Sequence, residues 1–243
     1  MFSVALLEVF LALDEIQLLR AGQRRGESQM RFRSLIVAIL ATIPIAGCTY
    51  DDGPNRTKRY LELGIDAPQK NEVVICHAYG CKMKTPYRFT SANIAEITRE
   101  MQRVKRNNSP AEERRAIAYA IGLMERQVGA AIGIKDKAGM QWSASGDPTQ
   151  EDCVDESTNT TSFLTVLQSN GLLHYHTVQG PLGEDNMLYG TLIGRPVKYW
   201  PHYTAIILET KTSQRWAVDS WIGNNGENPS ITKVEDWYLK GTS

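Results

Sequence analysis

The segment between Met30 and Cys48 limits what this chain can fold into more than any other feature. Two arginines, Arg31 and Arg33, precede an apolar run over residues 35–45 that is too short to cross a bilayer as a helix. Small residues and a cysteine follow the run. Basic residues, a short apolar stretch and a small-residue boundary, in this order, are typical of a secretory signal. The residues after this segment are therefore expected to fold in an oxidising compartment, where disulfides persist.

The end of the segment is more specific than its hydropathy. The residues Ile45-Ala46-Gly47-Cys48 resemble the lipobox of bacterial lipoproteins. The resemblance implies cleavage before Cys48 and a diacylglycerol on its thiol. Such an anchor would hold the protein on the membrane at the periplasmic side of the bacterial cell envelope, at the outer membrane rather than the inner. An ordinary secretory signal and a membrane-proximal helix are the alternatives.

The chain is expected to contain one folded domain. Met30 is a natural start for a signal peptide, so residues 1–29 are interpreted as an over-extended reading frame and residues 30–47 as the lipoprotein signal. The polar stretch over 48–71 suits a tether. Residues 72–243 are expected to form a single domain.

Charge argues against one class of partner. The 243 residues include 27 Lys+Arg and 27 Asp+Glu, so the formal net charge is zero. Nucleic-acid binding needs a surplus of basic side chains, so we expect no nucleic-acid partner. With 42% hydrophobic residues, the composition is that of a globular protein rather than of a disordered or polytopic membrane protein.

Apolar spacing and turn residues predict helices first and strands afterwards. Ser109, Pro110 and Glu112 form a typical helix start with a capping box, and Asn170-Gly171 form a typical helix end. Helices are predicted over 91–105, 109–129, 153–169 and 234–239. Strands are predicted over 172–178, 187–193, 202–209 and 215–220. This order predicts an α+β fold in which N-terminal helices pack on a C-terminal antiparallel sheet.

The spacing of the cysteines predicts a disulfide. Cys76 follows a strand-like stretch and is separated from Cys81 by four residues, which places both thiols across a hairpin. Half of a C-x4-C metal site is the alternative, but no second pair of Cys or His at metal spacing follows nearby. With Cys48 used by the lipid, the disulfide leaves the thiol of Cys153 for another role.

Cys153, His202 and Asp219 form the candidate catalytic group. Cys153 lies at a predicted helix start, where backbone N–H groups and the helix dipole stabilise a thiolate. If the last two long strands form a hairpin about Thr210-Lys211, His202 lies directly opposite Asp219. A slip of one or two residues is the alternative. The carboxylate would orient the imidazole, whose other nitrogen would face the thiol.

Three short motifs give this group a family resemblance: Asp152-Cys153-Val154-Asp155, Pro201-His202-Tyr203-Thr204-Ala205 and Trp216-Ala217-Val218-Asp219-Ser220-Trp221. Over roughly residues 140–240, their order resembles the transglutaminase-like branch of the papain-like superfamily, and more narrowly the bacterial transglutaminase-like cysteine proteinases. The resemblance implies a transglutaminase/papain-like fold. It also implies Cys153 as nucleophile, His202 as general base and acid, and Asp219 as the orienting residue.

The residues before the cysteine depart from that family. Glu151 and Asp152 stand where many members carry a small residue, and neighbouring carboxylates raise the pKa of a thiol. This effect is limited if Asp152 serves as the helix N-cap and Glu151 points to water. The oxyanion donors are expected to be the Cys153 backbone N–H and the side chain of Gln150 or Trp142.

The function implied is hydrolysis of peptide or isopeptide bonds through a thioester acyl-enzyme, on a peptide or protein substrate in the cell envelope and without a cofactor or metal. The alternative is a catalytically silent envelope lipoprotein that binds a peptide or envelope component in the same groove. Taken singly, each residue of the group also has a structural explanation, such as a small buried thiol or a turn-capping aspartate.

Two further histidines suggest a third hypothesis. His174 and His176 face the same side of a predicted strand, and with His202 they could bind zinc. Surface or pocket-lining histidines are the favoured interpretation.

Overall fold

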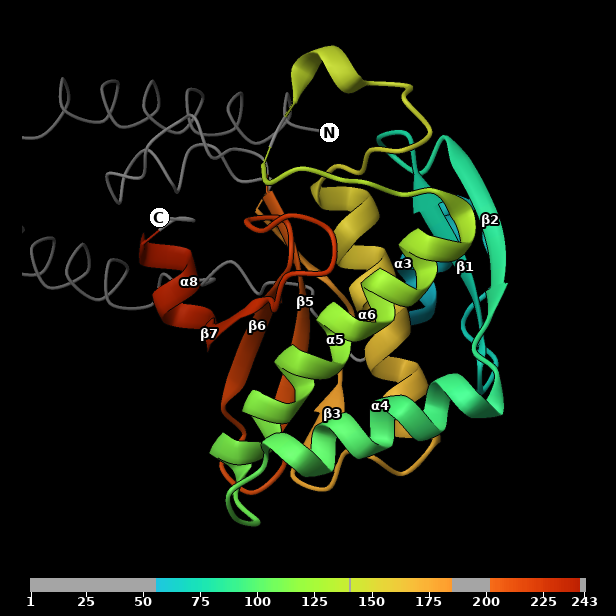
Figure 1. The fold of residues 1–243 in the computed structure, drawn as a ribbon. Coiled ribbons are helices and arrows are strands. Elements are labelled where there is room, and N and C mark those ends of the chain that lie inside the picture. The colour runs from blue at the N-terminus through green and yellow to red at the C-terminus, as the bar shows by residue number, and fades with distance from the viewer. Residues whose placement is uncertain (1–55, 140, 185–201, 241–243) are drawn as a thin grey trace, which may run out of the picture. The chain divides into compact units, whose positions relative to one another are not determined.

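The structure is a computed structural model that describes residues 56–139, 141–184 and 202–240 (Figure 1). The predicted signal over 30–47, the lipidation site Cys48 and the predicted strand over 187–193 lie outside the described residues. Within the described ranges, no helix has the length and apolar character needed to cross a membrane.

The long helices of the domain precede the main sheet: α4 (Ser91–Val104), α5 (Pro110–Ile132) and α6 (Cys153–Ser169). The Ser109 hydroxyl caps α5 by accepting the Glu112 N–H, as predicted. The Glu112 carboxylate accepts the Arg106 N–H instead of closing the predicted capping box. Helix α5 continues past its predicted end at Gly129 and stops at Gly133, whose φ of 87° lies in the left-handed region.

The strands form two sheets. Strands β1 (Glu72–His77) and β2 (Met83–Arg88) make an antiparallel hairpin. The second sheet contains β3 (His176–Val178), β4 (Leu182–Glu184), β5 (His202–Glu209), β6 (Arg215–Asp219) and β7 (Ser230–Lys233), and α8 (Val234–Lys240) follows it. Its order is β3-β5-β6-β7, with β4 paired to the start of β5, and all pairings are antiparallel. The predicted α+β class is confirmed.

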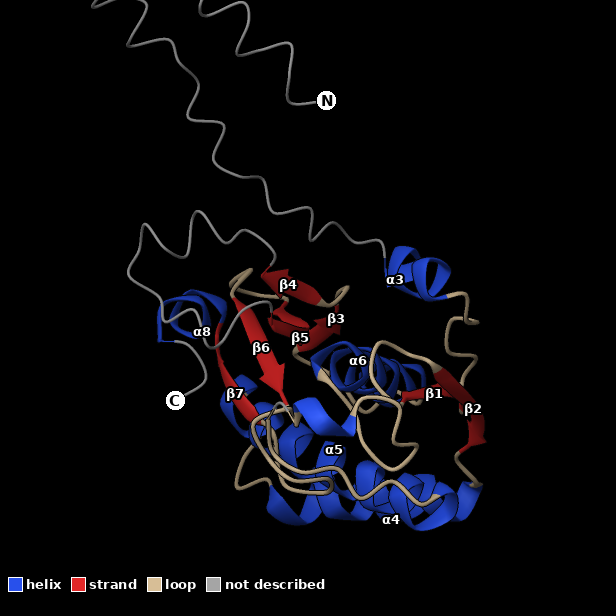
Figure 2. Ribbon diagram, turned by 90° about the horizontal axis from the view of Figure 1, so that it is seen from above, coloured by secondary structure: helices blue, strands red, loops and turns tan. Residues whose placement is uncertain are grey.

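Helix α6 lies between the β1–β2 hairpin and β5 (Figures 1 and 2) and contacts both. This position buries its polar residues as well as its apolar ones. Hydroxyls therefore bond to carbonyls one turn earlier, as Thr161 does to Ser157 (2.7 Å). The Asn159 amide bonds to both the N–H (2.8 Å) and the C=O (2.7 Å) of Cys76. These bonds make α6 a rigid support for its first residue, Cys153.

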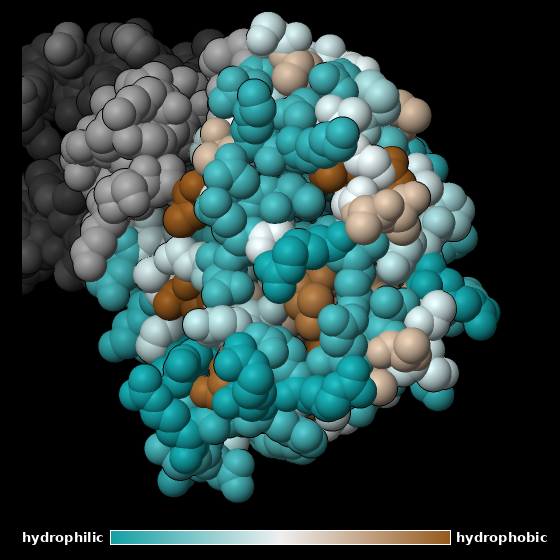
Figure 3. Space-filling model, in the orientation of Figure 1, coloured by the Kyte–Doolittle hydropathy of each residue, from teal (hydrophilic) through white to brown (hydrophobic). Residues whose placement is uncertain are grey.

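The hydrophobic core joins the helices to both sheets. Its buried members include Ile75, Phe89, Ile117, Phe163 and Ile207. On the face shown in Figure 3, hydrophobic residues form small separate areas among hydrophilic ones.

The folded part begins earlier than predicted. Residues 56–71, assigned by sequence to the tether, contain helix α3 (Arg56–Leu63). Tyr60 in this helix is buried, and its hydroxyl lies 3.0 Å from the Ser162 Oγ of α6. The tether interpretation is therefore wrong for residues 56–71, because contacts such as those of Tyr60 and of Arg59, which lies over the Tyr203 ring, hold the helix on the domain.

Candidate functional site

His202 and Asp219 meet in the interior of the domain. The Nε2 of His202 lies 2.8 Å from the Oδ2 of Asp219, and both side chains are buried. His202 begins β5 and Asp219 ends β6, so neighbouring strands of one sheet hold the pair. The predicted contact between the two side chains is confirmed.

The strand register differs from the prediction. The structure pairs Ala205 with Val218 and Ile206 with Ala217, so the continuing register sets Thr204, not His202, opposite Asp219. The turn explains the difference, because Glu209 donates its N–H to the Gln214 carbonyl (2.8 Å) and the turn is centred one residue later than expected. The two-residue slip leaves His202 and Asp219 on the same face as diagonal neighbours.

Two tryptophans complete the surroundings of the imidazole. Trp237 Nε1 donates to the same Asp219 Oδ2 at 2.8 Å. The ring of His202 lies 4.5 Å from that of Trp221 and 5.4 Å from that of Trp237. The carboxylate oxygen accepts from both donors, so the hydrogen of the neutral imidazole is on Nε2. Nδ1 has no hydrogen-bond partner among the described residues and is left as the basic nitrogen.

Sequence reasoning missed Trp237. Its place beside Asp219 depends on β7, a short strand that carried no clear alternation in the sequence and that returns the chain to the edge of β6. Trp221 ends one of the three motifs, but no sequence signal indicates its contact with His202.

The thiol of Cys153 lies against the start of β5. Cys153 is the first residue of α6 and is buried. The backbone N–H of Tyr203, the residue after His202, forms a hydrogen bond to the thiol, and the charge of Asp219 is close enough to act on it. The structure therefore places the thiol beside the residue that follows His202 and within electrostatic range of Asp219.

The electrostatic environment keeps this thiol neutral. Burial raises the pKa of Cys153 to about 12, and the charge of Asp152 adds to the increase. The hydrogen bond from the Tyr203 N–H lowers the pKa, whereas the charge of Asp219 raises it further. The expectation that the helix N-terminus would stabilise a thiolate is not met, because desolvation and two nearby carboxylates outweigh the dipole.

The two acidic residues before Cys153 behave differently from each other. Asp152 is the N-cap of α6, as expected, and its Oδ1 accepts the N–H groups of Val154 and Asp155, each at 3.0 Å. Glu151 is buried, so the condition that it points to water is not met. The Asn159 amide donates to Glu151 Oε1 at 2.5 Å and holds it inside.

The structure bears differently on the three candidates for oxyanion donors. The Nε2 of Gln150 donates to the carbonyls of Lys135 (3.1 Å) and Thr149 (3.3 Å), so both amide hydrogens are used within the protein. This geometry does not support Gln150 as an oxyanion donor. Trp142 is in the short 3-10 helix Trp142–Ala144, and its side chain lies outside the described part of the chain. The Cys153 backbone N–H lies beside its own sulfur and stays the best-placed candidate.

Cys76 and Cys81 form the predicted disulfide. The sequence predicts that the two residues face each other across the hairpin, and this part of the prediction is wrong. Cys76 pairs with Lys84 in the strand register, while Cys81 belongs to the turn. The alternative of a metal site from these cysteines is not supported. They and Asp155 are the only metal-type cluster found in the described residues, and their sulfurs are bonded to each other.

The histidines proposed for zinc do not meet. His176 pairs with Glu209 at the far end of β5, seven residues from His202, which at about 3.3 Å per residue is roughly 23 Å. The Nδ1 of His176 is bonded to the buried Glu113 carboxylate (2.9 Å). His176 therefore has a structural role.

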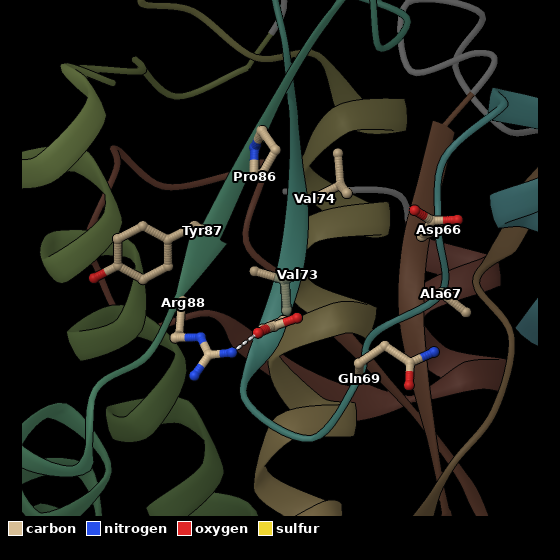
Figure 4. Close-up of a pocket in the computed structure, with 9 residues that line it drawn as sticks. Asp66, Ala67, Gln69, Val73, Val74, Pro86, Tyr87 and Arg88 are labelled. Atoms are coloured by element: carbon tan, nitrogen blue, oxygen red, sulfur yellow. Dashed lines mark hydrogen bonds and ion pairs between the residues drawn. The ribbon is translucent and has the colours of Figure 1, made fainter.

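A pocket of about 520 Å³ lies at the open end of the β1–β2 hairpin (Figure 4). Its lining includes Asp66, Gln69, Val73, Tyr87 and the ion-paired Glu72 and Arg88. Cys153 contacts nothing there, because the first turn of α6 is attached to the opposite end of the hairpin. The candidate site, formed by Cys153, His202 and Asp219, therefore does not include this pocket.

The Trp237 hydrogen bond has a measurable consequence. Trp237→Phe removes a donor to a buried carboxylate, a bond that contributes about 1.5–3 kcal/mol. Trp221→Phe is the matched control, because Trp221 also packs on His202 but its Nε1 has no partner in the described residues. We expect Trp237→Phe to lower the free energy of unfolding in urea by that amount more than Trp221→Phe. Equal losses in the two variants would contradict the assignment.

Comparison of the chain with family models, with curated proteins and with solved structures finds no match in any of the three.

Proposed function

We propose that this protein hydrolyses peptide or isopeptide bonds, with Cys153 as nucleophile, His202 as general base and acid, and Asp219 as the orienting residue. The observation that carries the proposal is the state of the imidazole. Its Nε2–H is held by Asp219, and its buried Nδ1 has no partner in the described residues. The Cys153 thiol accepts a hydrogen bond from the backbone N–H of Tyr203, the residue after His202. In the same proposal, a lipid on Cys48 holds the enzyme at the periplasmic side of the cell envelope.

The chemistry follows from this tautomer. As the sulfur of Cys153 attacks the amide carbonyl, its proton passes to Nδ1 of His202, and Asp219 stabilises the imidazolium. The imidazolium then protonates the leaving amine, and the C–N bond breaks to give a thioester. Water attacks the thioester with His202 again as base, which releases the acid and restores the thiol. Overall, one water is consumed for each amide bond.

The raised pKa of Cys153 favours one of two versions of the mechanism. A resting thiolate–imidazolium pair would require a thiol pKa below that of the imidazole, whereas burial and Asp152 place it far above. The proton is therefore transferred during the attack rather than before it. This version predicts slow reaction with a plain alkylating agent and an ester turnover that depends on His202.

The test uses a p-nitrophenyl ester, which reports acyl transfer to a thiol without knowledge of the natural substrate. We expect turnover in the wild type and at least a 10³-fold loss in Cys153→Ala and in His202→Ala. His174→Ala is the control, because this exposed histidine lies outside the site and its removal leaves the rate unchanged.

Iodoacetamide gives the second readout. At pH 7 we expect Cys153 to react no faster than a simple thiol of pKa about 8.5. Ester turnover that is the same in wild type and Cys153→Ala would overturn the proposed function and favour the silent lipoprotein, whose groove holds a peptide or envelope component without cleaving it.

A further inference from the structure

The turn between β1 and β2 has a backbone conformation that side chains disfavour. Ala78, Tyr79, Gly80 and Cys81 have φ angles of 68°, 69°, 67° and 57°. Only one of the four is glycine, and the left-handed region costs other residues about 1–2 kcal/mol each. Strained residues persist where the surroundings hold them, and they gather at functional sites. The question is what holds this turn.

The turn is held by the two aspartates that flank Cys153. Successive N–H groups in such a turn point to one side and form a concave site for an anion. The N–H groups of Tyr79 and Cys81 donate to the two oxygens of Asp155, at 2.9 and 2.6 Å. The N–H of Gly80 donates to Asp152 Oδ2 at 2.9 Å. Three consecutive backbone donors of the turn are thus bound to the first helical turn of α6.

Two further bonds fix the turn from the other side. The Cys76–Cys81 disulfide joins it to the end of β1. Cys76 is itself held by Asn159, in the middle of α6. The turn is therefore attached to α6 both directly, through Asp155, and indirectly, through the disulfide.

We propose that Asp155 is a positioning residue for Cys153, which it holds in place by binding the left-handed turn 78–81. Asp155 is fully buried, lies two residues after the thiol and also accepts the Asp152 N–H (3.3 Å). Cys153 is thus enclosed between two residues that cannot move without releasing the turn. A displacement of about 1 Å at a reacting atom costs on the order of 10²-fold in rate. The inference rests on the proposed function.

The experiment compares two buried aspartates. Asp155→Asn leaves one acceptor oxygen for the two N–H groups of Tyr79 and Cys81, so one of them faces an amide hydrogen. Asp136→Asn is the matched control, because Asp136 is also buried but accepts the Glu151 N–H, and within the described residues no hydrogen bond joins its side chain to the turn. We expect Asp155→Asn to lower p-nitrophenyl ester turnover at least tenfold and Asp136→Asn to change it less than twofold, with both proteins folded by circular dichroism.

A second comparison separates positioning from simple stabilisation. The same Asp155→Asn change is made in the His202→Ala background, and the reaction of Cys153 with the ester is measured there. If Asp155 aligns the thiol with His202, its replacement has no effect once the imidazole is gone. An effect of the same size in both backgrounds, or none in the wild-type background, overturns the inference.

If Asp155→Asn does not fold, a second variant that lacks the Cys76–Cys81 disulfide tests the same inference. Cys76→Ser/Cys81→Ser releases the turn without changing either aspartate, and the same loss is expected, again only when His202 is present. If His202→Ala alone leaves ester turnover unchanged, the proposed function fails and the inference falls with it. If His202→Ala abolishes turnover but neither turn variant lowers it, the inference alone is wrong.

Discussion

Replacing Asp219 by alanine is expected to lower the rate of ester hydrolysis about 10⁴-fold, whereas Asp219→Asn should lower it only about 10²-fold. The difference arises from what each change does to the tautomer of His202. Alanine leaves Nε2 without an acceptor, so the hydrogen of the imidazole is free to move to Nδ1, where it blocks the base. Asparagine removes the negative charge and keeps the shape.

The orientation of the asparagine amide is decided by Trp237. The Oδ2 position of Asp219 accepts from His202 Nε2 and from Trp237 Nε1. An amide NH₂ at that position would face two donors, so the oxygen takes it. The NH₂ then occupies the place of Oδ1, which has no hydrogen-bond partner in the described residues. Nε2 of His202 therefore keeps its hydrogen, and the loss of rate is that of the charge alone.

This reasoning predicts strong coupling between the two residues. In Asp219→Asn/Trp237→Phe, a single donor remains at the Oδ2 position, and the amide can turn over and donate to His202 instead. We expect the double variant to fall to the rate of Asp219→Ala, although Trp237→Phe alone changes the rate less than tenfold. Turnover measured at pH 7 for the four proteins gives the coupling. An Asp219→Asn rate equal to that of Asp219→Ala would show that Trp237 does not orient the side chain.

Local signals in the sequence were sufficient for much of the fold. The bounds of α6 are those predicted, because Asp152 and Gly171 mark its ends and no competing signal lies between them. Strand β5 likewise has its predicted bounds. The disulfide followed from spacing and compartment, and the contact of His202 with Asp219 followed from the period of two along strands.

The largest errors concern the β5–β6 turn and contacts between distant segments. The register depended on which residue of the β5–β6 turn takes a positive φ, and Ser213 (59°) does so without a glycine to signal it. Glu151 is buried, and the Asn159 amide of α6 bonds to its carboxylate; no pattern around Glu151 indicates that bond. The tether contains α3, which is held by residues far away in the sequence: Tyr60 contacts Ser162, and Arg59 lies over the ring of Tyr203. Such contacts are tertiary and leave no local pattern.

Two buried glutamates of α5 provide the second large effect, because their environments shift them in opposite directions. Burial acts to raise the pKa of Glu113, but the bonds from His176 and from the backbone N–H groups of His174 and Tyr175 outweigh it and lower the pKa. Glu125 has one such bond, from the Gly226 N–H. Burial raises the pKa of Glu125 to about 8; the Gly226 bond and Arg126 oppose this, and Asp136 adds to it.

The pH dependence of stability should therefore change sign between the two positions. Glu125 contributes stability that is fully present below about pH 4.5, its ordinary pKa, and is lost as the pH rises towards 8, by about 1.4 kcal/mol per pH unit for each extra proton the folded state holds. Glu113 contributes stability above its ordinary pKa and loses it in acid.

We expect Glu125→Gln to raise the free energy of unfolding at pH 8 and leave it unchanged at pH 4.5. Glu113→Gln, which leaves backbone donors without an acceptor, should lower it by about 3–5 kcal/mol at pH 7. Urea unfolding followed by tryptophan fluorescence from pH 4.5 to 8.5 measures both, and parallel profiles for the two variants would contradict the assignment.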